Sequence, residues 1–216
     1  RCHDELTLEM VTPEEREWMW EFYAPDPKQR INMGIRRRLA PLLENDKRKI
    51  LLMHSMLLTM VGSPFLYYGD EIGMGDNVDL FDRNGVRTPM QWDGSLNAGF
   101  SDADPAKLYA PVIKDEVYGY QWVNVAAQEA DPDSLLNRLR HMISVRKEHA
   151  LFGRGDFAWK AFSFDSKAVV VYQRSLQGER VVVLNNLSGE EVSGWVPETA
   201  QSFEDLLTGE TVLPGD

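Results

Sequence analysis

Residues 45–74 contain the pattern that most restricts the fold of this chain. Asn45 and Asp46 can begin a helix whose apolar residues recur at helical spacing, and Gly62 stands where that helix would end. Residues 65–68 follow as an apolar and aromatic run without alternating polar positions, which is typical of a strand covered on both faces. A polar loop, residues 69–74, comes next. This order predicts an α/β fold on a parallel sheet, with functional groups at the carboxyl end of the strand.

A second helix is expected close to the amino terminus. Thr12 can cap it, Pro13 suits its first position, and Glu15 stands three residues after the cap. Its aromatic side chains are Trp18, Trp20 and Phe22. We expect them to pack against a neighbouring segment, and a platform for a sugar ring is the alternative.

Residues 75–132 form a long excursion with little regular structure. A stretch of this length inside a domain is either functional or disordered. Six aromatic residues beyond position 91 favour an ordered loop, because disordered segments are poor in them. The following stretch, 134–149, predicts a helix with basic residues at its end.

The carboxyl-terminal part of the chain has the character of strands. Three strand-like runs lie within residues 157–187, with turns at Asp165-Ser166 and Gln177-Gly178, and two shorter strands flank Thr208-Gly209. We therefore expect two domains. Residues 1–152 would hold the α/β part, with the long loop at 75–132, and residues 153–216 a small all-β domain.

Charge and composition exclude several classes of function. The net charge of −11 argues against a nucleic-acid binder, which needs a basic face for phosphates. The basic cluster at 36–38 is expected to be the solvated face of a short helix. No apolar run approaches the roughly 20 residues of a membrane span. The only cysteine, Cys2, forms no intrachain disulfide, which fits a reducing, cytoplasmic location.

Three polar clusters are candidates for chemistry: His3-Asp4-Glu5, Asp70-Glu71 and the segment 82–92. In a barrel, the ends of consecutive strands lie on one face, so the first two clusters are expected to share it. Paired carboxylates near a histidine suit the cleavage of glycosidic bonds. An exposed acidic helix start is the alternative for residues 3–5. Metal-ligand spacings and a Gly-x-Ser-x-Gly motif do not occur in the sequence, which disfavours metal centres and serine hydrolases.

Residues 3–10, 62–74 and 82–92 together resemble the α-amylase superfamily and, within it, the trehalose synthases (maltose α-D-glucosyltransferases). The resemblance extends over essentially the whole chain. It implies the C-terminal part of a (β/α)8 TIM barrel followed by a small all-β sandwich domain. The segment 87–92 is typical of the branch that also contains oligo-1,6-glucosidases and sucrose isomerases.

The resemblance also implies site residues. Asp4 matches the third catalytic carboxylate, which binds sugar hydroxyls and supports the distorted ring, and His3 matches the histidine beside it. Arg87 and Arg83 match arginines that reach the sugar, and Glu5 is included among the substrate-binding residues. Two further acidic residues, Asp70 and Glu71, match the end of the eighth strand, where a structural role is expected. Cys2 stands where the family usually has asparagine.

The resemblance implies an enzyme that isomerises maltose to trehalose by retaining, intramolecular transglucosylation with some hydrolysis to glucose. The family's nucleophilic aspartate and its acid/base glutamate precede the third carboxylate, so we expect this chain to be an inactive piece of a longer protein. We expect no cofactor and no metal here; a calcium site elsewhere, a homo-oligomer and a fused or associated maltokinase remain open. The alternatives are an α-glucosidase, oligo-1,6-glucosidase or sucrose isomerase of the same branch, and a non-catalytic carbohydrate-binding barrel.

Overall fold

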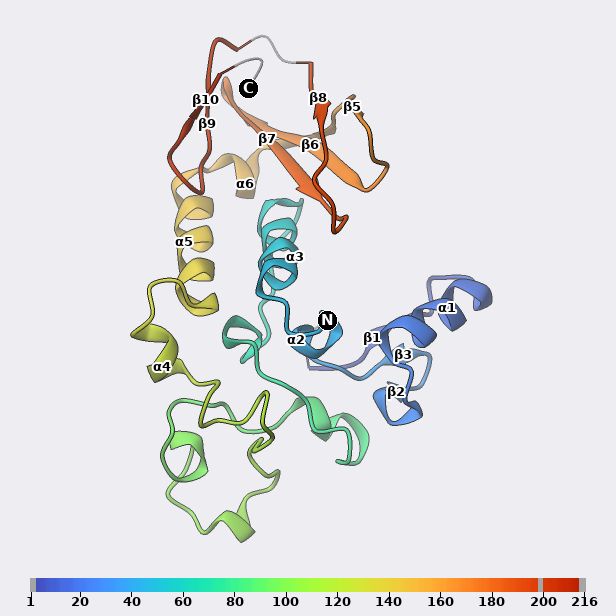
Figure 1. The fold of residues 1–216 in the computed structure, drawn as a ribbon, viewed down its shortest axis with the longest axis vertical. Coiled ribbons are helices and arrows are strands. Elements are labelled where there is room, and N and C mark those ends of the chain that lie inside the picture. The colour runs from blue at the N-terminus through green and yellow to red at the C-terminus, as the bar shows by residue number, and fades with distance from the viewer. Residues whose placement is uncertain (1–2, 198–199, 214–216) are drawn as a thin grey trace. The chain divides into compact units, whose positions relative to one another are not determined.

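The computed structural model describes residues 3–197 and 200–213, which divide into two units (Figure 1). One unit comprises residues 1–51 and 65–139, and the other comprises residues 52–64 and 140–216. The division falls inside two helices, α3 (Lys47–Thr59) and α5 (Leu135–Glu148), which lie where the sequence predicted them. The predicted domains at 1–152 and 153–216 stay a prediction. No helix of the described residues is long and apolar enough to cross a membrane.

In the first unit, helix α1 (Pro13–Tyr23) begins with the predicted capping box. Thr12 Oγ1 accepts a hydrogen bond from Glu15 N at 3.2 Å, and Glu15 Oε2 accepts one from Thr12 N at 2.9 Å. Trp20 packs with a cluster around Ile35, as expected. Trp18 and Phe22 instead stack on each other at 5.9 Å and remain 61% and 68% exposed.

Three short strands, one before α1 in the sequence and two after it, form an antiparallel sheet in the order β1-β3-β2 (Figure 1). They are β1 (Leu6–Thr7), β2 (Arg30–Ile31) and β3 (Gly34–Ile35). A Cβ atom at Gly34 would lie 2.6 Å from Leu6 O, so this pairing needs glycine there. The short helices η1 (Pro27–Gln29) and α2 (Leu39–Leu42) flank the β2-β3 hairpin.

The prediction of a buried strand at residues 65–68 is wrong. These residues are irregular, and Phe65 and Leu66 are 71% and 41% exposed. A strand forms only where a neighbour accepts its backbone hydrogen bonds, and the paired strands of the described residues all lie elsewhere and are antiparallel. The described residues therefore form helices with small antiparallel sheets and do not close a barrel.

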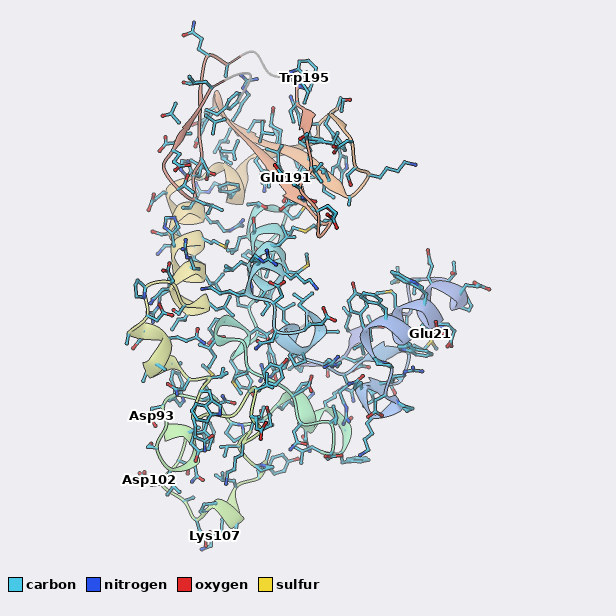
Figure 2. All side chains as sticks on the ribbon, viewed as in Figure 1. Glu21, Asp93, Asp102, Lys107, Glu191 and Trp195 are labelled. Atoms are coloured by element: carbon cyan, nitrogen blue, oxygen red, sulfur yellow. The ribbon has the colours of Figure 1, made fainter. Side chains whose placement is uncertain are left out.

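The excursion at 75–132 contains short helices only. They are η3 (Asp82–Val86), η4 (Leu96–Gly99), η5 (Pro105–Lys107) and α4 (Val125–Glu129), and η2 (Asp70–Ile72) precedes them. Met90 of the excursion packs in a buried cluster that also includes Met74. The fully buried Gln91 donates to Tyr118 O at 3.1 Å, which ties distant parts of the excursion together. Figure 2 shows Asp102 and Lys107 at its outer edge.

The second unit is built on a three-stranded antiparallel sheet in the order β4-β6-β7. Its strands are β4 (Asp156–Trp159), β6 (Val169–Leu176) and β7 (Glu179–Asn186), and helix α6 (Leu151–Arg154) precedes them. Gln177 and Gly178 have φ of 50° and 93°, which makes the predicted turn a type I′ hairpin.

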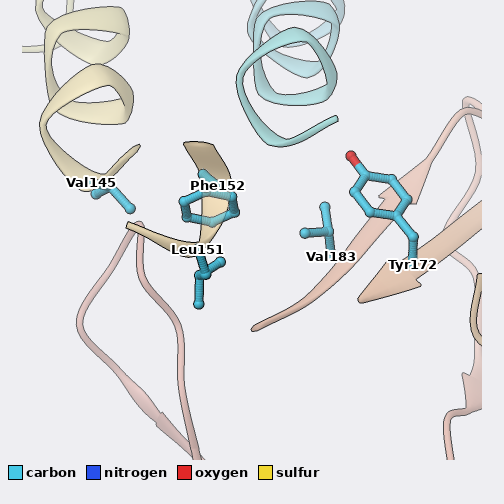
Figure 3. Close-up of a cluster of buried hydrophobic side chains, with 5 residues drawn as sticks. All are labelled: Val145, Leu151, Phe152, Tyr172 and Val183. Atoms are coloured by element: carbon cyan, nitrogen blue, oxygen red, sulfur yellow. The ribbon is translucent and has the colours of Figure 1, made fainter. Parts of the chain in front are cut away.

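Two more antiparallel strand pairs complete the second unit. They are β5 (Ser163–Phe164) with β8 (Gly194–Trp195), and β9 (Phe203–Glu204) with β10 (Thr211–Val212). The core of the unit gathers Tyr172 and Val183 from the sheet with residues of α5 and α6 (Figure 3). The strands predicted in this region are present as small antiparallel pairs and sheets, and an all-β domain at 153–216 stays a prediction.

Candidate functional site

Two segments far apart in sequence form the candidate site. Residues 3–5 lead into β1, whereas Arg83 lies in η3 and Arg87 directly follows it. Two tyrosines hold η3 and the residues that follow it. Tyr67 donates its hydroxyl proton to Val86 O at 3.0 Å, and Tyr68 donates to Thr88 O at 2.7 Å.

The Arg83 guanidinium joins the two neighbouring carboxylates. Its Nε lies 2.9 Å from Asp4 Oδ1 and 2.9 Å from Glu5 Oε2, and its Nη2 donates to Glu5 Oε1 at 3.2 Å. The bidentate contact to Glu5 fixes the plane of the guanidinium. Its remaining arm donates to Asp82 Oδ1 at 3.0 Å.

Arg87 approaches Asp4 as well. Its Nη2 donates to Asp4 Oδ1 at 3.1 Å, and its Nε donates to the carbonyl of His3 at 2.9 Å. Asp4 Oδ1 therefore faces two guanidinium groups. Its other oxygen, Oδ2, lies 3.3 Å from Nε2 of His3. All five residues expected at the site from the sequence are thus brought together.

The two carboxylates of the site differ in exposure. The side chain of Glu5 is 12% exposed, whereas that of Asp4 is 54% exposed. Burial alone would raise the pKa of Glu5, but hydrogen bonds from Asn32, at 2.8 Å, and from Arg83 outweigh it and lower the pKa. Glu5 is accordingly an anchor for Arg83, and Asp4 is the carboxylate that a ligand can reach.

The second acidic cluster has a different setting. Asp70 is 8% exposed and lies 3.2 Å from Nη1 of Arg38, which is fully buried, with its Cζ 4.9 Å from the ring centroids of both Tyr67 and Tyr68. Burial raises the pKa of Glu71. These surroundings fit the structural role implied for both residues. That Asp70 and Glu71 share a face with His3 and Asp4 stays a prediction.

A family model described as the catalytic domain of α-amylase matches residues 35–155, more than half of the chain. The chain belongs to the α-amylase family. The matched range includes Arg83 and Arg87, whereas His3, Asp4 and Glu5 lie before it.

Individual relatives give a narrower comparison. The chain is 54% identical over 192 residues to trehalose synthase of Pimelobacter sp., covering 87% of this chain and 33% of that protein. It is 38% identical to the amino acid transporter heavy chain SLC3A1 of Rattus norvegicus, over 72% of this chain and 22% of the relative. The predicted resemblance to trehalose synthases is therefore confirmed, and the chain spans about a third of the length of the first of these relatives.

A solved structure shares the fold. Trehalulose synthase MutB from Pseudomonas mesoacidophila aligns with a TM-score of 0.56 and 25% identity, over 73% of this chain and 34% of that one. The portion of the family's catalytic domain in this chain is thus recognisable in three dimensions.

The prediction for Arg36, Arg37 and Arg38 is wrong. They do not form a solvated helix face, because they lie in an irregular segment between β3 and α2, and Arg36 and Arg38 are 7% and 0% exposed. Sequence reasoning missed them because it weighed their charge alone. The available signal was the buried apolar residue on either side, Ile35 before them and Ala40 after them.

The remaining expectations concern metals and Cys2. Among residues 3–197 and 200–213, no group of three or more metal-ligating side chains is gathered. The substitution of cysteine for asparagine at position 2 lies outside the described residues.

Proposed function

We propose that this chain is part of a trehalose synthase, which isomerises maltose to trehalose by intramolecular transglucosylation with retention, and that His3, Asp4, Arg83 and Arg87 contact the sugar. The 54% identity to the Pimelobacter enzyme supports the reaction. The observation that carries the proposal for the site is the position of Asp4 Oδ1, which faces both Arg83 and Arg87 at 2.9 and 3.1 Å.

The geometry suits Asp4 for holding a sugar ring. The two arginines fix the direction of its carboxylate, while its exposure leaves room for hydroxyl groups to donate to it. A fixed negative charge beside the anomeric centre stabilises the oxocarbenium-like transition state of glycoside cleavage. The exposed ring of His3, 3.3 Å from Asp4 through Nε2, supplies a further polar contact for the same hydroxyls.

The covalent steps belong to residues outside this chain. An aspartate attacks the anomeric carbon of maltose, and a glutamate gives its proton to the leaving glucose, so that a glucosyl-enzyme forms. The glucose turns in place, and its own anomeric hydroxyl attacks the anomeric carbon of the glucosyl-enzyme while giving its proton back to the glutamate. The bond to the aspartate breaks, which yields trehalose and restores both residues. Water that reaches the glucosyl-enzyme first produces hydrolysis, so the site must exclude water. We assign part of that exclusion to the excursion at 75–132.

The test compares the chain alone with a full-length protein that contains it. With maltose as substrate, the full-length protein is expected to form trehalose together with a little glucose, and the chain alone is expected to form neither. Trehalose formation by the chain alone would contradict the division of roles. Glucose as the only product of the full-length protein would favour a hydrolase.

Two alternatives have specific support. A sucrose isomerase or α-glucosidase is favoured by the likeness to trehalulose synthase MutB, and a non-catalytic barrel by the likeness to the transporter heavy chain. Incubation with maltose, sucrose and isomaltose separates them, because an isomerase acting on sucrose converts it and a non-catalytic protein leaves all three unchanged. A cytoplasmic location stays a prediction.

A further inference from the structure

The buried Arg36 donates hydrogen bonds to several backbone carbonyls of the loop that leads into η3. Its Nη1 donates to Leu80 O at 2.5 Å and also to Asp82 O, and its Nη2 donates to Val78 O at 2.7 Å. The three acceptors belong to alternate residues of one loop, so the loop wraps around a single guanidinium. Only 7% of Arg36 is exposed, so water competes little for these carbonyls.

Arg36 is itself fixed to η1, which directly precedes the β2-β3 hairpin. Its backbone N donates to Gln29 O at 2.7 Å, and its Nη2 also donates to Lys28 O at 2.5 Å. Arg36 thus connects two parts of the chain. One part is η1 with the β2-β3 hairpin, whose strand β3 pairs with β1, directly after residues 3–5. The other part is the loop that leads to Arg83 and Arg87. The two segments that form the candidate site are therefore both held in place by one side chain.

The conformation of Asp82 explains why its carbonyl, the last in the loop, needs the hydrogen bond from Arg36, which we call the clamp. Asp82 has φ of 53°, a left-handed conformation that costs a residue with a side chain about 1 kcal/mol. Asp82 precedes Arg83 and also accepts a hydrogen bond from it at 3.0 Å. If the clamp on Asp82 O were lost, the backbone would relax and Arg83 would leave the carboxylates.

We propose that Arg36 is a positioning residue, which holds loop 78–82 so that Arg83 and Arg87 reach Asp4. Its effect on catalysis rests on the function proposed above, whereas its effect on the loop does not. Lysine cannot replace it, because one ammonium group cannot donate to four carbonyls in the directions that a planar guanidinium covers.

The loop itself gives the first test, by amide hydrogen exchange on the full-length protein. The amides of Leu80, Asn84 and Arg87 donate within the loop and η3 and report its order. In Arg36→Lys we expect their exchange to accelerate about tenfold or more, with the amides of α1 unchanged. Unchanged exchange in the loop would overturn the proposal.

Arg30→Gln is the matched control. Arg30 also holds backbone carbonyls, those of Ala24 at 2.7 Å and Pro25 at 3.4 Å, but these lie at the end of α1. Its loss should leave exchange at residues 80–87 unchanged. Acceleration equal to that of Arg36→Lys would show a general loosening of the unit and would overturn a specific role.

A double-mutant cycle gives the second test. Arg36→Lys should lower kcat/KM for maltose by about 10- to 100-fold, as small misplacements of binding groups do. If Arg36 acts through Arg83 and Arg87, adding Arg36→Lys to the double variant Arg83→Lys/Arg87→Lys should cost little more, whereas adding Arg30→Gln should have the same effect in that variant as in the wild type. A loss from Arg36→Lys that is as large in the double variant as in the wild type would overturn the proposal. A wild-type protein inactive on every sugar, with accelerated loop exchange in Arg36→Lys, would refute the proposed function and leave the positioning role standing.

Discussion

Arg83 lies within 2.9 Å of Glu5 across 78 positions of sequence, and the same Nε lies 2.9 Å from Asp4. The contact brings the segment before β1 against η3. Because Glu5 is largely buried and Asp4 is not, a single arginine is anchored by one carboxylate and directed at the other.

Asp4→Asn is expected to reduce turnover of maltose by the full-length protein. Asparagine keeps the shape of the side chain but removes the negative charge that the transition state requires, and removal of one such group costs about 100- to 1,000-fold in kcat. Steady-state kinetics with maltose measures the loss. Asp102→Asn, an exposed change of the same kind, should have no effect. Equal activity of Asp4→Asn and the wild type would remove Asp4 from the site.

The capped helix near the amino terminus was predictable, because its capping box at Thr12 and Glu15 is local in sequence. Family motifs pointed to Arg83 and Arg87, which lie beside Asp4 in the structure, and their contact with a sugar stays a prediction. The irregular conformation of residues 65–68 was not predictable, because strand pairing depends on neighbours that a local pattern does not contain. The burial of Arg36 and Arg38 also escaped, since acceptors such as Leu80 O, Asp82 O and Tyr68 O are backbone carbonyls distant in the sequence, which a local pattern does not reveal.

Glu5 should make stability depend on pH. Its pKa is lowered in the folded protein, so the unfolded protein binds the proton more readily and stability rises with pH through this range. The contribution is fully present above the ordinary pKa of about 4.3 and is lost as pH falls through the lowered value. Urea unfolding from about pH 3 to about pH 6 measures it. Glu5→Gln should flatten the dependence, and an unchanged slope would show that the hydrogen bonds from Asn32 and Arg83 do not stabilise the folded anion.

Arg174→Met should destabilise the second unit by about 3 kcal/mol or more, because it leaves several buried carbonyls without a donor. Arg174 is 2% exposed and donates to Thr59 O at 2.8 Å, Phe152 O at 3.1 Å and Gly155 O at 2.9 Å, among others. Burial lowers the pKa of its guanidinium. Chemical denaturation gives the difference. The exposed Arg154→Met is the control, and a matching loss in both variants would contradict a special role for Arg174.

Tyr109→Ala should raise the ratio of hydrolysis to isomerisation in the full-length protein. Tyr109 belongs to the excursion at 75–132, is 90% exposed, and its hydroxyl accepts a hydrogen bond at 3.4 Å from Nδ2 of Asn84, which lies in η3 beside Arg83. If the excursion excludes water from the glucosyl-enzyme, loss of a contact worth about 1 kcal/mol should raise the share of glucose about fivefold. The glucose and trehalose formed from maltose give the ratio directly. Tyr109→Phe separates the hydrogen bond from the ring: a rise in both variants assigns water exclusion to the hydroxyl, and a rise in Tyr109→Ala alone assigns it to the ring. An unchanged ratio in Tyr109→Ala would show that this part of the excursion does not cover the site.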